Sequence, residues 1–191
     1  MVILLKAHYG FFFHKKKQKQ ESGARIMNFE IRIGYRPGVI GRVCFLHAVY
    51  YAGEWNFGHV FEAGVAVELA DFIERHDPSR DRIWTLDADG EIEGSIAIQG
   101  SRDGESRAWL RWFIVSDRLK GKGAGRRLVE RAVSFSREAG FEKVSLWTFQ
   151  GLSAARHLYE RFGFRQVEEK PGSRWGRTVN ERRFELDLTA S

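Results

Sequence analysis

Residues 107–139 constrain the fold of this chain more than any other segment. The run RAWLRWFIVS at 107–116 is almost entirely apolar, which predicts a strand in the middle of a sheet with both faces covered. The loop RLKGKGAG follows at 118–125, and apolar residues then recur at three- and four-residue steps as far as Ala139, which predicts a helix. A buried strand is therefore joined to an amphipathic helix by a loop rich in glycine.

The glycine-rich loop predicts an anion site at the start of the helix. Gly121, Gly123 and Gly125 allow the backbone to approach a ligand closely. The first N–H groups of a helix are unpaired and carry a partial positive charge, which suits a phosphate or pyrophosphate. Four cations lie in the same segment: Lys120, Lys122, Arg126 and Arg127. The alternative is a glycine-rich turn whose cations are only solvated.

Two common phosphate-binding motifs are excluded by the spacing. A P-loop requires G-x-x-x-x-G-K-[ST], but Gly125 is followed by two arginines and no hydroxyl for magnesium. A dinucleotide fingerprint requires G-x-G-x-x-G. Counted from Gly121 its last position is Arg126, and counted from Gly123 it is Leu128.

Two segments resemble a known family. VSDRLKGKGAGRRLVERAV, with the strand LRWFIV leading into it, resembles the acetyl-CoA-binding segment of the GNAT superfamily of N-acetyltransferases. The family's loop reads [QR]-x-x-G-x-[GA], and KGKGAG at 120–125 takes its place. SAARHLYERFGF at 153–164 resembles the family's later helix, A-x-x-L-Y-x-x-x-G-F. The matching residues there are Ala155, Leu158, Tyr159, Gly163 and Phe164. The resemblance covers roughly residues 28–188.

The order of predicted elements indicates the α+β (mixed α/β) class. Strands are predicted at 29–33, 82–87, 91–98, 107–116, 142–149, 164–168 and 182–188, and helices at 38–51, 59–76, from the glycine loop to 139, and at 154–162. The resemblance implies a GNAT-like fold. Such a fold has a central mixed, mostly antiparallel sheet, with two splayed parallel strands and flanking helices.

The resemblance also implies a site for acetyl-CoA between the two splayed strands, here 108–116 and 142–149. The first of these strands would pair its backbone with the pantetheine arm, a backbone N–H near Ile114 or Val115 would polarise the thioester carbonyl, and the loop would bind the pyrophosphate. The implied cofactor-binding residues are Phe113, Ile114, Val115, Lys120, Gly121, Lys122, Gly123, Ala124, Gly125 and Arg126. Tyr159 would protonate or hydrogen-bond the departing thiolate; the alternative is a packed helix residue.

The acceptor side departs from the family pattern. Lys120 replaces the usual Gln or Arg, Asp117 stands where Pro is frequent, and Phe149 and Leu152 stand where an Asn often makes contacts. Candidate general bases are Glu54, His59, Glu62 and Glu105, although each is more often a solvated residue, and deprotonation through water requires none. Candidate pocket residues are Trp55, Phe57, Trp112 and Trp147, with core packing as the alternative.

Composition limits the partners. The net charge is +6, but residues 1–27 hold six cations and one anion, which leaves +1 for residues 28–191. A globally basic nucleic-acid surface is therefore not expected. The single cysteine, Cys44, excludes an intrachain disulfide and indicates a cytoplasmic protein. The histidines lack H-E-x-x-H, there is no C-x-x-C, and no apolar run approaches the roughly 20 residues of a membrane span. No metal and no membrane are expected.

Residues 1–26 are predicted to be a basic, disordered extension before a domain at 27–191. Their apolar-then-basic order is the reverse of a signal peptide. The alternatives are a basic arm for anionic lipid or nucleic acid, or an upstream start with Met27 as the true first residue.

The function predicted from the resemblance is acetyl transfer from acetyl-CoA to a primary amine, on a small molecule or a peptide, by direct attack in a ternary complex. The alternatives are an acyl-CoA sensor that acts through a partner without turnover, and an interaction protein driven by the basic segment. The 142–164 stretch and RRFELDL also resemble acetyltransferase domains fused to MarR-type repressors. A homodimer is left open.

Overall fold

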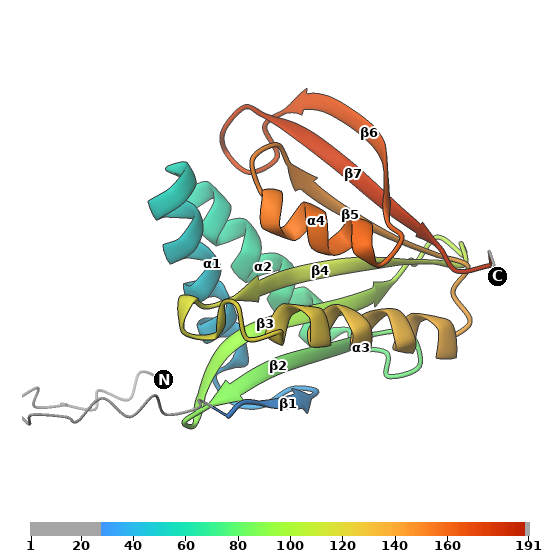
Figure 1. Cartoon of the computed structure of the whole chain (residues 1–191), viewed down its shortest axis with the longest axis horizontal. Helices are drawn as coiled ribbons and strands as arrows, with labels where there is room; N and C mark the ends of the chain where they lie inside the picture. The colour runs from blue at the N-terminus through green and yellow to red at the C-terminus, as the bar shows by residue number, and fades with distance from the viewer. Residues whose placement is uncertain (1–27, 190–191) are drawn as a thin grey trace, which may run out of the picture.

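The computed structural model describes residues 28–189, and its elements follow the order predicted from the sequence (Figure 1). The strands are β1 (Glu30–Ile33), β2 (Arg82–Ala88), β3 (Glu91–Gly100), β4 (Arg107–Val115), β5 (Lys143–Phe149), β6 (Arg165–Gly172) and β7 (Val179–Asp187). The helices are α1 (Val39–Trp55), α2 (His59–Glu74), α3 (Ala124–Glu138) and α4 (Ser153–Arg161), with a short 3-10 helix at Asp117–Leu119.

The strands form one mixed sheet in the order β1-β2-β3-β4-β5-β7-β6. Neighbouring strands are antiparallel, except that β4 and β5 are parallel. Within the described residues, the parallel pairing runs from Arg107, opposite Lys143, only as far as Trp109, opposite Ser145. Beyond this point β4 and β5 diverge, and Figure 1 shows the opening between them. The mixed, mostly antiparallel sheet with splayed parallel strands is confirmed.

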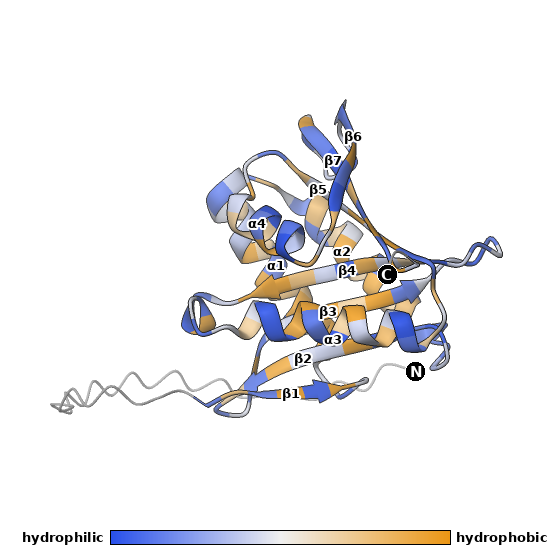
Figure 2. Cartoon of the chain, turned by 45° about the vertical axis from the view of Figure 1, so that its right-hand side comes forward, coloured by the Kyte–Doolittle hydropathy of each residue, from blue (hydrophilic) through white to orange (hydrophobic). Residues whose placement is uncertain are grey.

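Helices cover both faces of the sheet, because each helix has one apolar side to bury. On one face α1 and α2 form a core with Val43, Leu69 and Phe72. On the other face α3 and α4 bury residues such as Leu128 and Tyr159. Figure 2 shows β3 and β4 as largely hydrophobic ribbons beneath α3, whose residues alternate between hydrophilic and hydrophobic. The sheet is therefore the middle layer of three.

The central strand β4 is less uniformly buried than its apolar sequence predicts. Its residues alternate between buried and half-buried, and the strand lines a cavity from Trp109 to Val115. One extra residue in β4 interrupts its register with β3, and Trp112 has a φ of 46°. Because of this bulge, the buried side chains of β4 change from one face of the sheet to the other. Leu110 packs towards α3, whereas Trp112 and Ile114 pack with α1 and α2. Ser95 Oγ donates a hydrogen bond of 2.6 Å to the Trp112 carbonyl.

Several element ends differ from the sequence prediction. α1 was expected to end near residue 51 but continues to Trp55 and ends at Asn56, which has a φ of 54°. β6 and β7 are longer than predicted and pair as far as Gly172 and Val179. Pro171 is accommodated because β6 is an edge strand of the sheet.

The predicted extension at 1–26 lies outside the described residues, and the domain boundary at residue 27 stays a prediction. In the described part of the chain, no helix has the length and apolar character needed to cross a membrane. Across residues 28–189 there is also no cluster of three or more potential metal ligands.

Candidate active site

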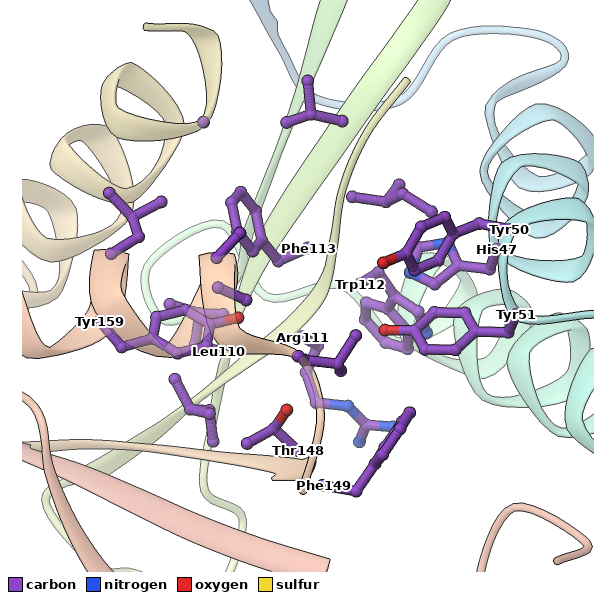
Figure 3. A pocket seen from close by; sticks show the side chains of 18 of the residues that line it. His47, Tyr50, Tyr51, Leu110, Arg111, Trp112, Phe113, Thr148, Phe149 and Tyr159 are labelled. Atoms are coloured by element: carbon purple, nitrogen blue, oxygen red, sulfur yellow. The ribbon is translucent and has the colours of Figure 1, made fainter. Parts of the chain in front are cut away.

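A cavity of about 920 Å³ opens where β4 and β5 diverge. Its volume lies within the range of small-molecule sites. The glycine loop and the start of α3 line one end, and α1, α2 and the loop between β6 and β7 line the other. Figure 3 shows Tyr159 on one side of the cleft, His47, Tyr50 and Tyr51 on the opposite side, and Arg111 between them.

The glycine loop presents the N-terminus of α3 to the cavity. Gly121 and Gly123 have φ values of 74° and 75°, in the left-handed region that favours glycine. No described side chain caps α3, whose N-cap residue is Gly123. The lining residues from this segment are Leu119, Lys120, Gly121, Gly123, Ala124, Gly125 and Arg126. The predicted residues are thus brought together, except Lys122, which does not line the cavity. The first turn of α3 can accept an anion there.

Asp117 and Lys120 form an ion pair at the entrance of the loop. This pair raises the pKa of Lys120, chiefly through the hydrogen bond to Asp117. The Lys120 ammonium also lies 5.3 Å from the ring centroid of Tyr50. Asp117, which departs from the family pattern, is therefore paired with a cation of the glycine loop.

A buried carboxylate anchors the start of the loop. Arg118 donates to Glu93 at 2.6 Å and to Asp89 at 2.9 Å. Glu93 also pairs with Arg42 of α1 at 3.5 Å, and its carbonyl accepts the Ser116 N–H at 2.8 Å. These contacts raise the pKa of Arg118, with Glu93 as the main cause. No local sequence pattern marks this network, because it joins residues that are distant along the chain.

The β4 segment from Phe113 to Val115 lines the middle of the cavity. One edge of β4 pairs with β3 there, and its other edge faces the opening towards β5. An unpaired strand edge of this kind can hydrogen-bond an extended ligand, as in β-augmentation. The structure therefore brings these three predicted residues to the same cavity as the glycine loop.

Tyr159 lines the cavity from α4 and is only 5% exposed. Its ring packs against Phe113, Phe164 and Phe184, with centroid distances of 5.9, 5.7 and 6.4 Å. Burial raises the pKa of Tyr159, and Tyr51 raises it further. The phenol consequently stays protonated and can donate a hydrogen bond.

Aromatic side chains dominate the end of the cavity away from the glycine loop. The aromatic residues that line it are Tyr51, Phe61, Trp109, Trp112, Trp147, Phe149 and Trp175. Tyr50 also lines the cavity, but its ring lies beside Lys120 of the loop. Trp112 and Trp147 were predicted to lie at the aromatic end. Phe57 is instead buried in the core, and Trp55 packs edge-on against Phe149 at 4.9 Å.

The candidate bases predicted from the sequence do not line this cavity. Of the described residues that line it, Glu68 is the only acid. Its side chain pairs with Arg111 of β4, whose guanidinium lies 4.7 Å from the Trp112 ring centroid and donates to Gln99 at 3.3 Å. No sequence motif marks Glu68 or Arg111, because they lie 43 residues apart and meet only where α2 packs beside β4.

His47 also lines the cavity, and its Nδ1 lies 2.8 Å from the Val43 carbonyl. Since a carbonyl only accepts, Nδ1 carries the proton and Nε2 carries the lone pair. Burial lowers the pKa of His47 to about 4. The ring stacks on Tyr51 at 6.1 Å. Val43, His47 and Tyr51 recur at four-residue steps, which is the one signal that could have placed His47 on the inner face of its helix.

The loop between β6 and β7 lines the aromatic end through Arg174 and Trp175. Arg177 donates to the carbonyls of Trp55 and Asn56 at 3.0 and 3.2 Å, at the C-terminus of α1. Arg174 is held by the buried carboxylate of Glu181 at 2.8 Å and lies 4.1 Å from the Trp147 ring centroid. The loop is therefore fastened at two points.

A mixed sheet that opens between two parallel strands, with an anion-binding helix terminus at the opening, is the GNAT-like architecture that the sequence predicts. Residues 42–164 match the family model described as "Acetyltransferase (GNAT) family". This match covers more than half of the chain, and the protein belongs to the GNAT acetyltransferase family.

Known relatives agree with this assignment. The chain is 31% identical over 83 residues to probable N-acetyltransferase camello of Xenopus tropicalis, a match that covers 44% of this chain but only 38% of that protein. A probable acetyltransferase from Staphylococcus epidermidis has a similar fold, with a TM-score of 0.67, 16% identity, and coverage of 85% of this chain and 100% of that one. YncA from Salmonella typhimurium, a putative acetyltransferase solved with acetyl-CoA, has a TM-score of 0.65 and 22% identity, and the coverage is 85% and 95%.

Proposed function

We propose that the protein transfers an acetyl group from acetyl-CoA to a primary amine in a ternary complex. The observation that carries the proposal is the continuity of the cavity. A single space joins the uncapped N-terminus of α3, the open edge of β4, Tyr159 and the aromatic end. Membership of the GNAT acetyltransferase family supports the proposal, as does the acetyl-CoA in the structure of YncA.

The residues present suit the parts of acetyl-CoA. The backbone N–H groups from Gly121 to Arg126 would hold the pyrophosphate, since an uncapped helix N-terminus with glycines in the left-handed region forms an anion cradle. The edge of β4 from Phe113 to Val115 would pair with the amides of the pantetheine arm. Lys120 and Arg126 would add charge to the cradle.

Acetyl-CoA supplies the acetyl group as a thioester. The neutral amine nitrogen bonds to the acetyl carbon, the carbon–sulfur bond breaks, and the nitrogen loses one proton. Tyr159 gives a hydrogen bond or a proton to the sulfur that leaves, and the proton released by the amine restores the balance through water. The products are an N-acetylated amine and CoA with a free thiol.

Direct transfer fits the chemistry of the only thiol in the chain. Cys44 is buried in the core between α1 and α2 and does not line the described cavity. Burial raises the pKa of Cys44, which keeps it as the unreactive thiol. An acetylated cysteine is therefore not part of the proposed route.

Calorimetric titration with acetyl-CoA, followed by thiol detection over a panel of amines, tests the proposal. We expect micromolar binding and thiol release that requires an amine. Binding without release over the whole panel would instead support an acyl-CoA sensor, and a folded chain that does not bind acetyl-CoA would contradict both functions.

A further inference from the structure

We propose that the acceptor is a free α-amino acid with a large apolar side chain, and that Arg111 binds its carboxylate while Glu68 receives its ammonium group. This inference rests on the proposed function, because it names the substrate class for the same cavity. It depends on how the charged and aromatic residues of the acceptor end are arranged.

Arg111 lines the same cavity as the expected reaction centre. It precedes Trp112, the bulged residue of β4, and the backbone that would polarise the thioester lies three residues further along the same strand, at Ile114. Figure 3 shows the Arg111 side chain within the cleft, between Tyr51, Thr148 and Phe149. In an α-amino acid the reacting nitrogen and the carboxylate share one carbon atom. A carboxylate held by Arg111 therefore keeps the nitrogen in the same part of the cavity.

Arg111 has a partner that a substrate can replace. Glu68 is 58% exposed, and an exposed ion pair contributes little stability. The guanidinium also packs over the Trp112 ring and donates a hydrogen bond to Gln99, and these contacts do not involve Glu68. A substrate carboxylate can form the bidentate contact that arginine favours. By contrast, Arg174 at the same end is held by Glu181, which is buried and only 3% exposed.

The Arg111–Glu68 pair matches a zwitterion in charge. When an amino acid binds, its carboxylate takes the place of Glu68 on Arg111, and its ammonium takes the place of Arg111 on Glu68. The ammonium then loses one proton to water, and the neutral nitrogen attacks the acetyl carbon. Each charge keeps a partner, so no charge is buried alone. A simple amine would pair only with Glu68 and would leave Arg111 without its carboxylate.

The rest of the acceptor end suits the side chain of a small molecule. Its walls include the rings of Tyr51, Phe149 and Trp175, which favour a large apolar group. The loop between β6 and β7 is fastened to α1 by Arg177 and lines this end through Arg174 and Trp175. The cavity of about 920 Å³ must hold both the acetylated arm of CoA and the acceptor, which suits an acceptor as small as a free amino acid.

Matched pairs of acceptors provide the test. Thiol release is measured with phenylalanine, with phenethylamine, which lacks the carboxylate, and with phenylalaninamide, in which the carboxylate is an amide. Methionine and leucine are each compared in the same way with the amine that lacks only the carboxylate. We expect kcat/KM to be about 100-fold higher for at least one amino acid than for its amine and amide. Arg111→Gln should remove this preference. Arg107→Gln removes a cation from the same strand outside the cavity and should retain the preference.

Calorimetry provides a readout that does not require turnover. The amino acid is titrated into the complex of the protein with CoA, and Arg111→Gln should abolish its binding while the affinity for acetyl-CoA stays within threefold. Equal rates for amines and amino acids would overturn the inference and leave the proposed function standing, and so would a preference for the amide or for a peptide N-terminus. A loss of acetyl-CoA binding in Arg111→Gln would show a structural role and would also overturn it. Absence of thiol release with every amine would contradict the proposed function itself.

Discussion

The guanidinium of Arg118 lies 2.6 Å from the carboxylate of Glu93, whose side chain is only 3% exposed. Glu93 belongs to β3, and Arg118 belongs to the short helix that leads into the glycine loop. Arg42 of α1 reaches the same carboxylate at 3.5 Å. One buried acid thus connects the sheet, the first helix and the entrance of the anion site.

Glu93→Gln should destabilise the fold and weaken acetyl-CoA binding together. The substitution leaves two guanidinium groups without their buried counter-charge, and breaking a buried pair costs about 3–5 kcal/mol. We expect a loss near the lower value, since Arg118 retains Asp89 at 2.9 Å. Urea denaturation followed by fluorescence measures it. Glu91→Gln, an exposed carboxylate on the same strand, is the control, and equal urea midpoints for the two variants would contradict the prediction.

Gly123→Glu should raise the Kd for acetyl-CoA by at least tenfold, which corresponds to about 1.4 kcal/mol. The side chain is strained at a φ of 75° and places an anion beside the proposed pyrophosphate site. Gly140→Glu is the matched control. Gly140 has the same φ of 75° and open space around it, but it lies past the other end of α3. Calorimetry on both variants separates backbone strain from the charge effect, and equal affinities would show that the loop does not hold the phosphates.

Tyr159→Phe should lower kcat by about 100-fold, at the lower end of the effect of a general acid. The Kd for acetyl-CoA should stay within threefold, because the ring and its packing against Phe113 and Phe164 are retained. Steady-state kinetics and calorimetry measure the two effects. Tyr35→Phe removes an exposed phenol that does not line the described cavity and should leave kcat unchanged. If Tyr159→Phe retained full kcat, the tyrosine would be a packing residue only.

The fold was largely predictable because its signals are local. The glycine loop, the apolar run at 107–116 and the periodicity of α3 each lie within a short stretch, and they place the central strand, the loop and the helix in order. Element ends were less accurate. α1 continues through Gly53 and ends only at Asn56, because a single glycine costs a helix only about 1 kcal/mol. The β6–β7 hairpin extends its pairing through cross-strand contacts that periodicity does not reveal.

The two ends of the site differed in how far the sequence could define them. The anion end is one continuous segment, so its residues were predicted together. The acceptor end is assembled from α1, α2, β4 and the β6–β7 loop. Glu68 and Arg111 meet only because α2 packs beside the central strand, and the bulge at Trp112 decides which side chains of β4 enter the cavity. Such contacts depend on tertiary packing, which a single sequence does not display.

The free energy of unfolding should decrease as the pH falls from about 6.5 to 4, and His47 should account for part of this decrease. Burial lowers the pKa of His47 from 6.5 to about 4. In this window the unfolded chain binds a proton at His47 that the folded chain does not bind, so stability rises with pH and is constant above about pH 7. The full difference corresponds to about 3 kcal/mol.

His47→Phe keeps a ring against Tyr51 but cannot titrate, so its stability should depend less steeply on pH. His157→Phe is the control, because the Nδ1 of His157 also lies 2.8 Å from the carbonyl four residues earlier, but at an exposed position. Urea denaturation from pH 4 to pH 8 measures all three proteins. If the curves of His47→Phe and the parent run parallel, the buried imidazole does not provide the pH dependence.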